Sequence, residues 1–350
     1  MTDPKPYPII DSHIHLYPSS EISQLAWNTD TTSPLHTQHS IDEYKTATDT
    51  PSNFEGFIFL ETDRINDLSK GAEGWEYPIR EIEFLRRIIE DEPREGEGHG
   101  KGDGKKCLGI VPWAPLPAGE DGMREYTELL KKRVGEKTWD RVRGYRYLVQ
   151  DKPKGTMLSD GFIEGLKWMG KEGLVFDLGV DQHSGGKWQL EEAVEMIGRA
   201  YEGVEDENRV RIVINHLCKP NLEIYNPTDP SFLTWRNAIT QLAKFPHTYM
   251  KLSGCFSEMP PALKNASVID ICIALQPYLA VILGVFGPSR VMFGSDWPVC
   301  TVGVESEEGA WVKWKQVVQK FCWLTSLGDE EQIWIWSGTA IKAYGIKDLV

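Results

Sequence analysis

Basic residues are scarce in this sequence, and they form no long run. The 350 residues include 38 Lys and Arg against 52 Asp and Glu, which gives a formal net charge of −14 at pH 7. Proteins that bind nucleic acid present a basic patch to the phosphates. The charge balance therefore argues against nucleic acid as a partner.

Closely spaced cysteines and the apolar core of a signal peptide are also missing. The six cysteines show no CxxC spacing and mostly stand in apolar runs, as reduced core thiols do. The first eight residues are rich in proline and polar side chains, unlike a signal peptide. The most apolar stretch, 266–286, contains Asp270, Gln276 and Pro277, which favours a buried helix over a membrane span. We expect a cytoplasmic protein without a membrane partner, and the sequence does not decide whether a homo-oligomer forms.

Short apolar strands alternate with helical patterns along the whole chain. No strand is followed by a GxGxxG fingerprint of dinucleotide-binding folds. Eight strands with intervening helices predict an α/β fold, a (β/α)8 TIM-type barrel made by a single domain over residues 1–350; a doubly wound open sheet is the alternative. The expected strands cover 9–17, 56–61, 107–113, 142–148, 173–179, 210–216, 249–253 and 290–296, and the expected helices 78–90, 120–134, 159–171, 189–201, 230–244, 266–284, 308–326 and 329–343.

Two long segments interrupt this alternation. Residues 18–40 form a loop whose Trp27 we expect to act as a lid. Residues 92–106 are rich in glycine and charge, a composition that cannot bury a core. We interpret this low-complexity insertion as a mobile loop on the face opposite to the site, with His99 in solvent.

The first strand carries the most informative motif. In Ile-Asp-Ser-His-Ile-His (10–15), residues at i and i+2 point to one face, so His13 and His15 emerge side by side, with Asp11 on the same face. Two neutral imidazoles at this spacing can hold one metal ion or polarise one carbonyl. The pair alone does not decide between chemistry and hydrogen-bonded structure.

Two more polar residues end the sixth and eighth strands. Alternation places His216 on the face of Ile212 and Ile214, and Asp296 on the face of Met292. In a (β/α)8 barrel, function sits at the carboxyl ends of the strands. Three imidazoles and one carboxylate would then converge over one pocket, a set that suits Zn²⁺ or a similar divalent ion. The predicted metal ligands are His13, His15, His216 and Asp296, and the predicted catalytic residues are Asp296 and His216.

Seven further side chains are candidates for substrate binding because of their chemistry and their places on the strands. Arg146, near the functional end of the fourth strand, could bind a carboxylate or a lactone oxygen. Lys251 is a charge inside an apolar strand, and lining of the barrel and snorkelling to solvent are equally open. The set comprises Glu61, Trp113, Arg146, Asp177, His183, Lys251 and Trp297.

These motifs resemble the amidohydrolase superfamily, in particular its single-domain branch called amidohydrolase-2. The combination of the last two strand motifs is similar to the sugar-lactone hydrolases of that branch, the L-fuconolactonase- and L-rhamnonolactonase-like enzymes. The resemblance implies an enzyme of carbohydrate metabolism that opens a cyclic ester, with His13, His15, His216 and Asp296 as the matched site residues. The matching segments are IDSHIH (10–15), RGYR (143–146), VFDL (175–178), VINHLCKP (213–220), MKLSG (250–254), MFGSDWP (292–298) and SGTAIKAYG (337–345).

Two departures from the superfamily bear on the cofactor. No lysine stands on the fourth strand, where binuclear members place a carboxylated bridging lysine, so at most one metal ion is expected. No histidine ends the fifth strand, where decarboxylase members carry a metal ligand. The expected cofactor is one divalent ion, with Zn²⁺ first and Mn²⁺ as the alternative. A reaction without metal also stays open, because some lactonases of this branch rely on the aspartate as general base.

The leading hypothesis is a hydrolase that opens a sugar-acid lactone by water attack. Asp296 would deprotonate the water, and the histidines, with or without a metal ion, would stabilise the oxyanion. One alternative is a metal-dependent non-oxidative decarboxylase of an aromatic or dienoic acid, against which the missing fifth-strand histidine counts. The other is a barrel that binds a small ligand without turnover.

Overall fold

The computed structural model describes residues 6–305 and 309–347, and these residues contain eight parallel strands in chain order. The first three strands pair in one sheet and the last five in a second, and strands adjacent in the chain are adjacent in the sheet. The strands are β1 (Ile9–Ile14), β2 (Phe54–Leu60), β3 (Cys107–Val111), β4 (Gly144–Arg146), β5 (Val175–Leu178), β6 (Arg211–Ile214), β7 (Thr248–Leu252) and β8 (Val291–Phe293).

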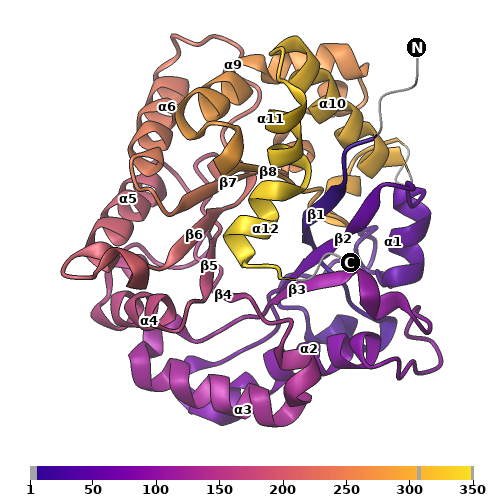
Figure 1. Cartoon of the computed structure of the whole chain (residues 1–350), viewed down its shortest axis with the longest axis vertical. Helices are drawn as coiled ribbons and strands as arrows, with labels where there is room; N and C mark the ends of the chain where they lie inside the picture. The colour runs from indigo at the N-terminus through magenta and orange to yellow at the C-terminus, as the bar shows by residue number, and fades with distance from the viewer. Residues whose placement is uncertain (1–5, 306–308, 348–350) are drawn as a thin grey trace.

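Two junctions close the sheets into one ring. Between β3 and β4, Ile110 and Val142 form a parallel bridge. Between β1 and β8, the backbone N–H of His15 donates to the carbonyl of Trp297 at 2.8 Å. Figure 1 shows the strands at the centre and the helices around them. The predicted (β/α)8 barrel is therefore confirmed, and the alternative of an open sheet is wrong.

The helices agree with the predicted bounds to within a few residues. The helix expected at 120–134 has a kink at Gly135, directly after its predicted end, and continues beyond it to residue 139. The helix expected at 329–343 is divided by a π-helical segment, Trp334–Gly338, and residue 308 of the helix expected at 308–326 lies outside the described residues. Several strands are shorter than predicted, most of all the fourth and the eighth, which keep three residues each, 144–146 and 291–293. The helices are α1 (Ile41–Thr48), α2 (Glu76–Ile89), α3 (Gly119–Trp139), α4 (Asp160–Lys171), α5 (Trp188–Tyr201), α6 (Pro230–Ala243), α7 (Cys255–Glu258), α8 (Pro261–Lys264), α9 (Val268–Phe286), α10 (Ala310–Leu324), α11 (Asp329–Ile333) and α12 (Thr339–Tyr344).

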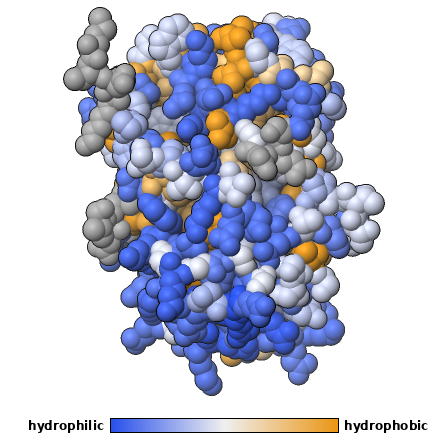
Figure 2. Space-filling model, turned by 90° about the vertical axis from the view of Figure 1, so that its right-hand side faces the viewer, coloured by the Kyte–Doolittle hydropathy of each residue, from blue (hydrophilic) through white to orange (hydrophobic). Residues whose placement is uncertain are grey.

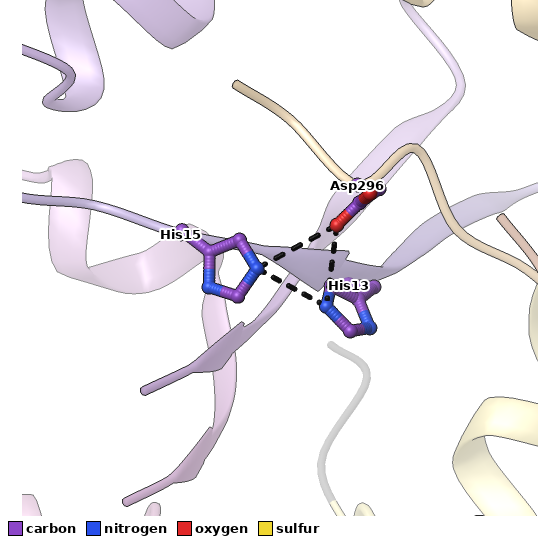
Figure 3. Close-up of side chains that lie close together, drawn as sticks. All are labelled: His13, His15 and Asp296. Carbon is purple, nitrogen blue, oxygen red and sulfur yellow. Dashed lines mark hydrogen bonds and ion pairs between the residues drawn. The ribbon is translucent and has the colours of Figure 1, made fainter. Parts of the chain in front are cut away.

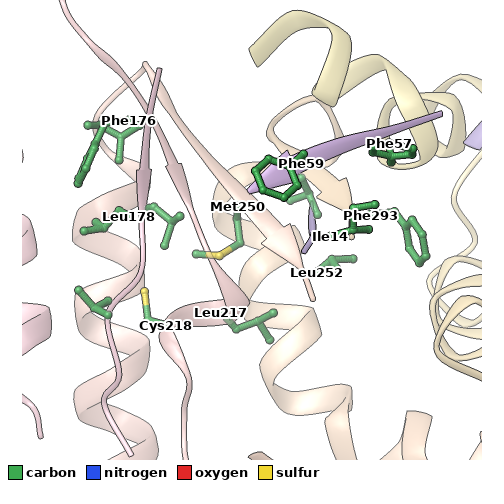
Figure 4. Close-up of a cluster of buried hydrophobic side chains, with 14 of the residues drawn as sticks. Ile14, Phe57, Phe59, Phe176, Leu178, Leu217, Cys218, Met250, Leu252 and Phe293 are labelled. Atoms are coloured by element: carbon green, nitrogen blue, oxygen red, sulfur yellow. The ribbon is translucent and has the colours of Figure 1, made fainter. Parts of the chain in front are cut away.

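Buried apolar side chains form an inner and an outer layer. The inner layer fills the ring with Ile10, Ile58, Val175 and Met292 and continues into α12. This helix crosses the middle of the ring in Figure 1, at the amino ends of the strands. The outer layer joins the other strand faces to the surrounding helices, and Figure 4 shows part of it. One end of the ring is thus closed, which leaves the carboxyl ends of the strands for a site.

Strand alternation holds for β8 and fails for β6. Met292 belongs to the inner layer, as expected for the face that leads to Asp296. On β6, Val213 is the inner residue, whereas Ile212 and Ile214 pack outward against the helices. The prediction that His216 shares a face with the two isoleucines is therefore wrong, and the chain must turn after Ile214 to bring that ring inward.

The insertion 92–106 packs along the barrel wall, so the prediction of an unpacked loop on the opposite face is wrong. Arg87 on α2 pairs with Glu97 at 2.5 Å, and each of these side chains is 7% exposed. The ring of His99 is buried beside Glu97, at 3.3 Å, instead of lying in solvent. The carbonyl of Gly98 accepts a hydrogen bond from the N–H of Asp42, in the first turn of α1. Pairing of its charges lets this glycine-rich segment fill the space between α1 and α2.

Helix α9 is buried on one side only. By length and composition it is apolar enough to cross a membrane, and 33% of its most apolar stretch lies inside the protein. Ile271 and Leu275 are buried, whereas Ile273 is 57% exposed. Figure 2 shows hydrophobic atoms gathered at the end of the molecule that α9 and α10 occupy in Figure 1, above a mostly hydrophilic surface. The prediction of a buried helix holds for its inner face.

Candidate active site

The first strand brings two imidazoles to the centre of the ring. The Nε2 atoms of His13 and His15 lie 3.2 Å apart. The pairing of β1 with β2 is irregular after Asp11, and this bulge turns the carboxylate of Asp11 away from the imidazoles. Its Oδ2 accepts hydrogen bonds from Tyr44 on α1 at 2.9 Å and from Trp311 on α10 at 2.8 Å. The prediction that Asp11 shares the face of the histidines is wrong.

The loop after β8 places Asp296 beside these rings. Asp296 has a left-handed backbone with φ of 63°, a conformation that costs a residue other than glycine about 1–2 kcal/mol. Two hydrogen bonds hold it: Ser295 N–H donates to Asp11 Oδ1 at 2.8 Å, and Asp296 N–H donates to the carbonyl of His13 at 2.9 Å. Asp11 is thus a structural residue that fastens the loop of Asp296 to β1.

His216 reaches the site through a turn that the strand pattern does not show. Residues 216–219 are all in the left-handed region, with φ between 46° and 61°, and none is a glycine. Lys219 N–H donates to the carbonyl of His216 at 2.7 Å, and the indole N–H of Trp235 donates to the carbonyl of Leu217 at 2.7 Å. The Nδ1 atom of His216 lies 2.9 Å from the hydroxyl of Ser253. The turn and the serine together orient this ring.

One carboxylate oxygen stands among the three imidazoles. Asp296 Oδ1 lies 3.5 Å from Nε2 of His13, 3.6 Å from Nε2 of His15 and 3.6 Å from Nε2 of His216. Figure 3 shows His13 and His15 turned toward the carboxylate. All four side chains are buried or nearly so. The structure therefore brings together the four residues that the sequence singles out.

Burial governs the charges of this cluster. Burial lowers the pKa of His216 to about 3. Burial, followed by the nearby Lys251 cation, lowers the pKa of His13 well below its usual value. Burial also raises the pKa of Asp296, but the neighbouring His216 and His15 outweigh it and the net shift is downward. At neutral pH, His13 and His216 are thus neutral imidazoles beside the Asp296 carboxylate, the charge state that a general base requires.

A cavity of about 310 Å³ opens above this cluster, within the size range of small-molecule sites. His15, His216 and Asp296 form part of its lining, and Trp27 covers part of it from the loop 18–40. The indole N–H of Trp27 donates to the carbonyl of Thr62 at 2.7 Å. The other lining residues are Tyr17, Leu35, Glu61, Thr62, Asp63, Arg146, Leu148, Gln150, Asp151, Lys219, Pro298 and Val299.

Arg146 and Glu61 are the predicted binding residues that line this cavity. Their side chains lie 3.3 Å apart and are 8% and 0% exposed. Burial raises the pKa of Glu61, and Arg146 opposes this shift. Glu61 Oε1 and Arg146 Nε have no hydrogen-bond partner among the described residues. Buried polar atoms normally find a partner, and the nearest charged group to Glu61 Oε1 is Nη1 of Arg146, at 3.3 Å.

Lys251 and Asp177 lie inside the ring, beneath the cavity. The ammonium group of Lys251 donates to Asp177 Oδ1 at 2.5 Å, and both side chains are fully buried. Lys251 therefore lines the barrel and does not snorkel to solvent. Burial lowers its pKa to about 8, with Asp177 acting in the opposite direction. Neither residue belongs to the lining of the cavity, so their predicted contact with substrate is not supported by their position.

The remaining three predicted binding residues also lie outside the lining of this cavity. Trp113 packs in the core against Tyr126, with ring centroids 5.5 Å apart. Trp297 is buried and adjoins a separate surface hollow beside α1. His183 is partly exposed and lies 3.3 Å from Glu258. Their roles in substrate binding stay predictions.

Sequence reasoning missed several residues that line the cavity. Lys219 enters through the left-handed turn, and no glycine between 216 and 219 marks that turn in the sequence. Asp63 and Asp151 sit in loops after β2 and β4. Their position depends on loop conformation, for which strand alternation gives no signal.

The spacing of the cluster fits one divalent metal ion. His13, His15 and Asp296 offer one ligand atom each, and these atoms lie within 4.8 Å of one another. A tetrahedral Zn²⁺ with bonds of about 2.0–2.1 Å separates its ligand atoms by about 3.3–3.4 Å. The observed separations of 3.2, 3.5 and 3.6 Å are close to this value. A His-His-Asp group able to surround an ion is therefore present.

The hydrogen bonds on the far side of the rings do not all fit such an ion. An imidazole that binds metal through Nε2 carries its proton on Nδ1 and donates it to an acceptor. For His15 the acceptor is the carbonyl of Leu60, 3.0 Å from Nδ1. For His13 the neighbour of Nδ1 is the ammonium group of Lys251, at 3.2 Å, and an ammonium group has only donors. The trio thus does not fit a resident metal ion while Lys251 is charged.

Comparison with known proteins gives three findings. The model of a family described as amidohydrolase matches residues 107–346. An L-rhamnono-gamma-lactonase of Scheffersomyces stipitis is 34% identical over 346 residues, which cover 97% of this chain and 99% of the relative. An L-fucono-1,5-lactonase of Burkholderia multivorans is 28% identical over 251 residues, 70% of this chain and 74% of the relative.

Solved structures show the same fold. Crystal structures of a Burkholderia multivorans amidohydrolase, one with bound HEPES and one with bound Zn, superpose with TM-scores of 0.73 and 0.69. Their sequences are 23% and 22% identical to this chain, and each alignment covers 97% of this chain and 100% of the solved one. The superposition supports the barrel architecture.

Proposed function

The chain belongs to the amidohydrolase family and is a hydrolase, and from this premise we propose that it opens the neutral lactone of a sugar acid. L-Rhamnono-γ-lactone and L-fucono-1,5-lactone, the compounds in the names of its relatives, are the first substrates to consider. The observation that carries this proposal is the carboxylate of Asp296 among three imidazoles, at the base of a cavity of about 310 Å³. Action in cytoplasmic carbohydrate metabolism is part of the same proposal.

In the proposed reaction, Asp296 takes a proton from a water molecule whose oxygen attacks the ring carbonyl. The carbonyl oxygen becomes an oxyanion, and donors in the cavity wall, from His216, Lys219 and Arg146, stabilise its charge. The bond between the carbonyl carbon and the ring oxygen then breaks. The proton on Asp296 passes to the departing oxygen, which leaves a hydroxy acid and restores the carboxylate.

The charges of the cavity favour a substrate that carries hydroxyl groups and no carboxylate. Its lining contains four acidic residues, Glu61, Asp63, Asp151 and Asp296, against the two cations Arg146 and Lys219. Each cation already has a partner, since Lys219 lies 3.8 Å from Glu258 and Arg146 lies 3.3 Å from Glu61. A carboxylate on the substrate would find both cations already paired, whereas sugar hydroxyls can donate hydrogen bonds to these acidic oxygens.

A metal ion is not part of the proposed reaction. The spacing of the trio would accept Zn²⁺, with Mn²⁺ as the alternative, and the charge of Lys251 beside His13 opposes it. The divalent ion therefore stays a prediction. No observation favours the decarboxylase, because His183, the histidine that follows the fifth strand, is partly exposed and pairs with Glu258.

The test is a hydrolysis assay in weakly buffered solution with a pH indicator, since each lactone opened near neutral pH releases one proton. The panel contains neutral aldonolactones and, as the charged control, a pyrone dicarboxylic acid. We expect rapid acid release from at least one neutral lactone and none above background from the dicarboxylate. Acid release from the dicarboxylate alone would overturn the substrate class, and none from any lactone would overturn the function.

A further inference from the structure

A row of buried polar side chains runs from the closed end of the barrel to the site. The hydroxyl of Tyr344 on α12 donates to Asp177 Oδ2 at 2.7 Å. The opposite oxygen of Asp177 accepts from Lys251 at 2.5 Å, and Lys251 Nζ lies 3.2 Å from Nδ1 of His13. These four side chains are at most 1% exposed. Inner strand positions usually carry apolar residues, so this polar row needs an explanation.

The Lys251 ammonium group and the carbonyl of Leu60 determine which ring nitrogens of His13 and His15 donate and which accept hydrogen bonds. Lys251, paired with a carboxylate, has only N–H donors, so Nδ1 of His13 must accept and the ring proton must be on Nε2. That proton faces Nε2 of His15, 3.2 Å away. His15 can accept it, because its own proton is on Nδ1 and goes to the carbonyl of Leu60 at 3.0 Å. Each hydrogen bond in the row then has one donor and one acceptor.

We propose that Lys251 is a positioning residue that holds His13 with its proton on Nε2, which makes this ring a hydrogen-bond donor at the site and not a metal ligand. Asp177 and Tyr344 hold Lys251 from below. His13 itself is fully buried and does not line the cavity. Its Nε2–H fixes His15, which does line the cavity beside Asp296. Lys251 therefore acts on the reaction through two rings and without contact to substrate.

The competing arrangement defines what the proposal excludes. An ion bound at Nε2 of His13 would require the proton on Nδ1, where it would face the ammonium group of Lys251 at 3.2 Å. One ring proton cannot serve both sites. Removal of the Lys251 ammonium group should therefore release the His13 proton to Nδ1 and make the trio a better metal site.

The first test is ¹⁵N NMR of histidine-labelled protein at neutral pH, with His13 assigned through the backbone. A ring nitrogen with a proton and one without differ widely in ¹⁵N shift, so the spectrum identifies the tautomer directly. We expect His13 with the proton on Nε2 and His15 with the proton on Nδ1. A wild-type spectrum with the His13 proton on Nδ1 overturns the proposal, whether or not any variant folds.

The second test compares Lys251→Met with Lys219→Met. Both variants remove one positive charge near the site, but Lys219 lines the cavity and does not contact His13 in the described structure. In Lys251→Met we expect the His13 proton on Nδ1 and a Zn²⁺ affinity at least tenfold above that of Lys219→Met, measured by calorimetry. An equal gain in Zn²⁺ affinity in both variants, or an unchanged His13 tautomer in Lys251→Met, would contradict the proposal. Lys251 would then be a buried charge without a positioning role.

The kinetic expectation rests on the proposed function, whereas the NMR and Zn²⁺ measurements do not. Because Lys251 does not line the cavity, Lys251→Met should lower kcat by about 100-fold, the loss typical of a displacement near 1 Å at a reacting group, and leave KM within about threefold. If Lys251→Met kept the wild-type kcat while the wild-type protein showed the expected His13 tautomer, only the link between Lys251 and catalysis would be contradicted. Absence of lactone hydrolysis in the wild-type protein would overturn the proposed function and leave the tautomer assignment standing.

Discussion

Gly254 is the residue whose replacement tests the position of His216 without removing any functional group. It follows Ser253, the hydroxyl partner of His216, and its φ is 65°. A methyl group built on Gly254 would lie 2.5 Å from Cγ and 2.8 Å from Cβ of His216. Ordinary carbon contacts are near 3.5–4.0 Å, so in Gly254→Ala the ring must move by about 1 Å and lose its serine partner.

The expected magnitude follows from this displacement. A shift near 1 Å at a group that acts on the reacting carbonyl costs about 100-fold in rate, so we expect kcat/KM of Gly254→Ala to fall by about two orders of magnitude in the pH-indicator assay. The left-handed backbone adds a loss of about 1–2 kcal/mol in the free energy of unfolding. Gly345→Ala is the matched control, because its φ is 60° and the methyl group would meet only Arg211 at ordinary contact distance, 3.7 Å.

We expect Gly345→Ala to lose stability to a similar degree from its backbone and to keep wild-type kcat/KM. Thermal melts and the hydrolysis assay separate the two effects. An active Gly254→Ala variant with His216 displaced in a crystal structure would show that the ring is not needed. An equal activity loss in Gly345→Ala would assign the effect to backbone strain and refute the reasoning about His216.

Three other predictions follow from the charges of the structure. The pKa of Asp296 is held below its usual value, so kcat/KM should stay level in mild acid and fall only below the usual aspartate pKa of about 3.9; an acid limb near pH 6.5 would point to a histidine. Prolonged dialysis against a strong chelator, with metal content measured by mass spectrometry, should leave kcat unchanged, and loss of activity restored by Zn²⁺ or Mn²⁺ would show that a metal is required. Glu97→Ala breaks the pair with Arg87 and should lower the free energy of unfolding, measured in urea, by on the order of 3 kcal/mol. The control Glu120→Ala breaks an exposed pair and should leave the free energy of unfolding unchanged. Equal effects of the two substitutions would mean that the insertion is not packed.

The sequence was sufficient to predict the barrel, its strand order and the four residues of the central cluster. Periodicity identifies strands and helices, and the rule that function lies at the carboxyl ends of barrel strands connects residues as distant as His13 and Asp296. Strand alternation alone misplaced Asp11, because a bulge in β1 rotates its side chain toward α1 and α10. It also misassigned the face of His216. This residue reaches the site through a left-handed turn, and the turn contains no glycine that would indicate it in the sequence.

Loop residues and pairings were beyond the reach of sequence patterns. Lys219 and Asp151 line the cavity because of loop conformation, and composition does not encode such geometry. The charged insertion looked solvated, yet Glu97 and His99 are buried because each has a partner. The same limit applies to Lys251, for which the sequence left lining of the barrel and snorkelling to solvent equally open and gave no sign of its partners, Asp177 and His13.

The measurement that tests the central claim most directly compares wild-type protein with Asp296→Asn on L-rhamnono-γ-lactone and L-fucono-1,5-lactone. Asparagine keeps the size of the side chain and cannot accept the proton of the attacking water, so general-base loss predicts a fall in kcat of about 10²–10⁴-fold with an unchanged melting temperature. A folded Asp296→Asn variant that opens either lactone at the wild-type rate would contradict the assignment of Asp296 as the base.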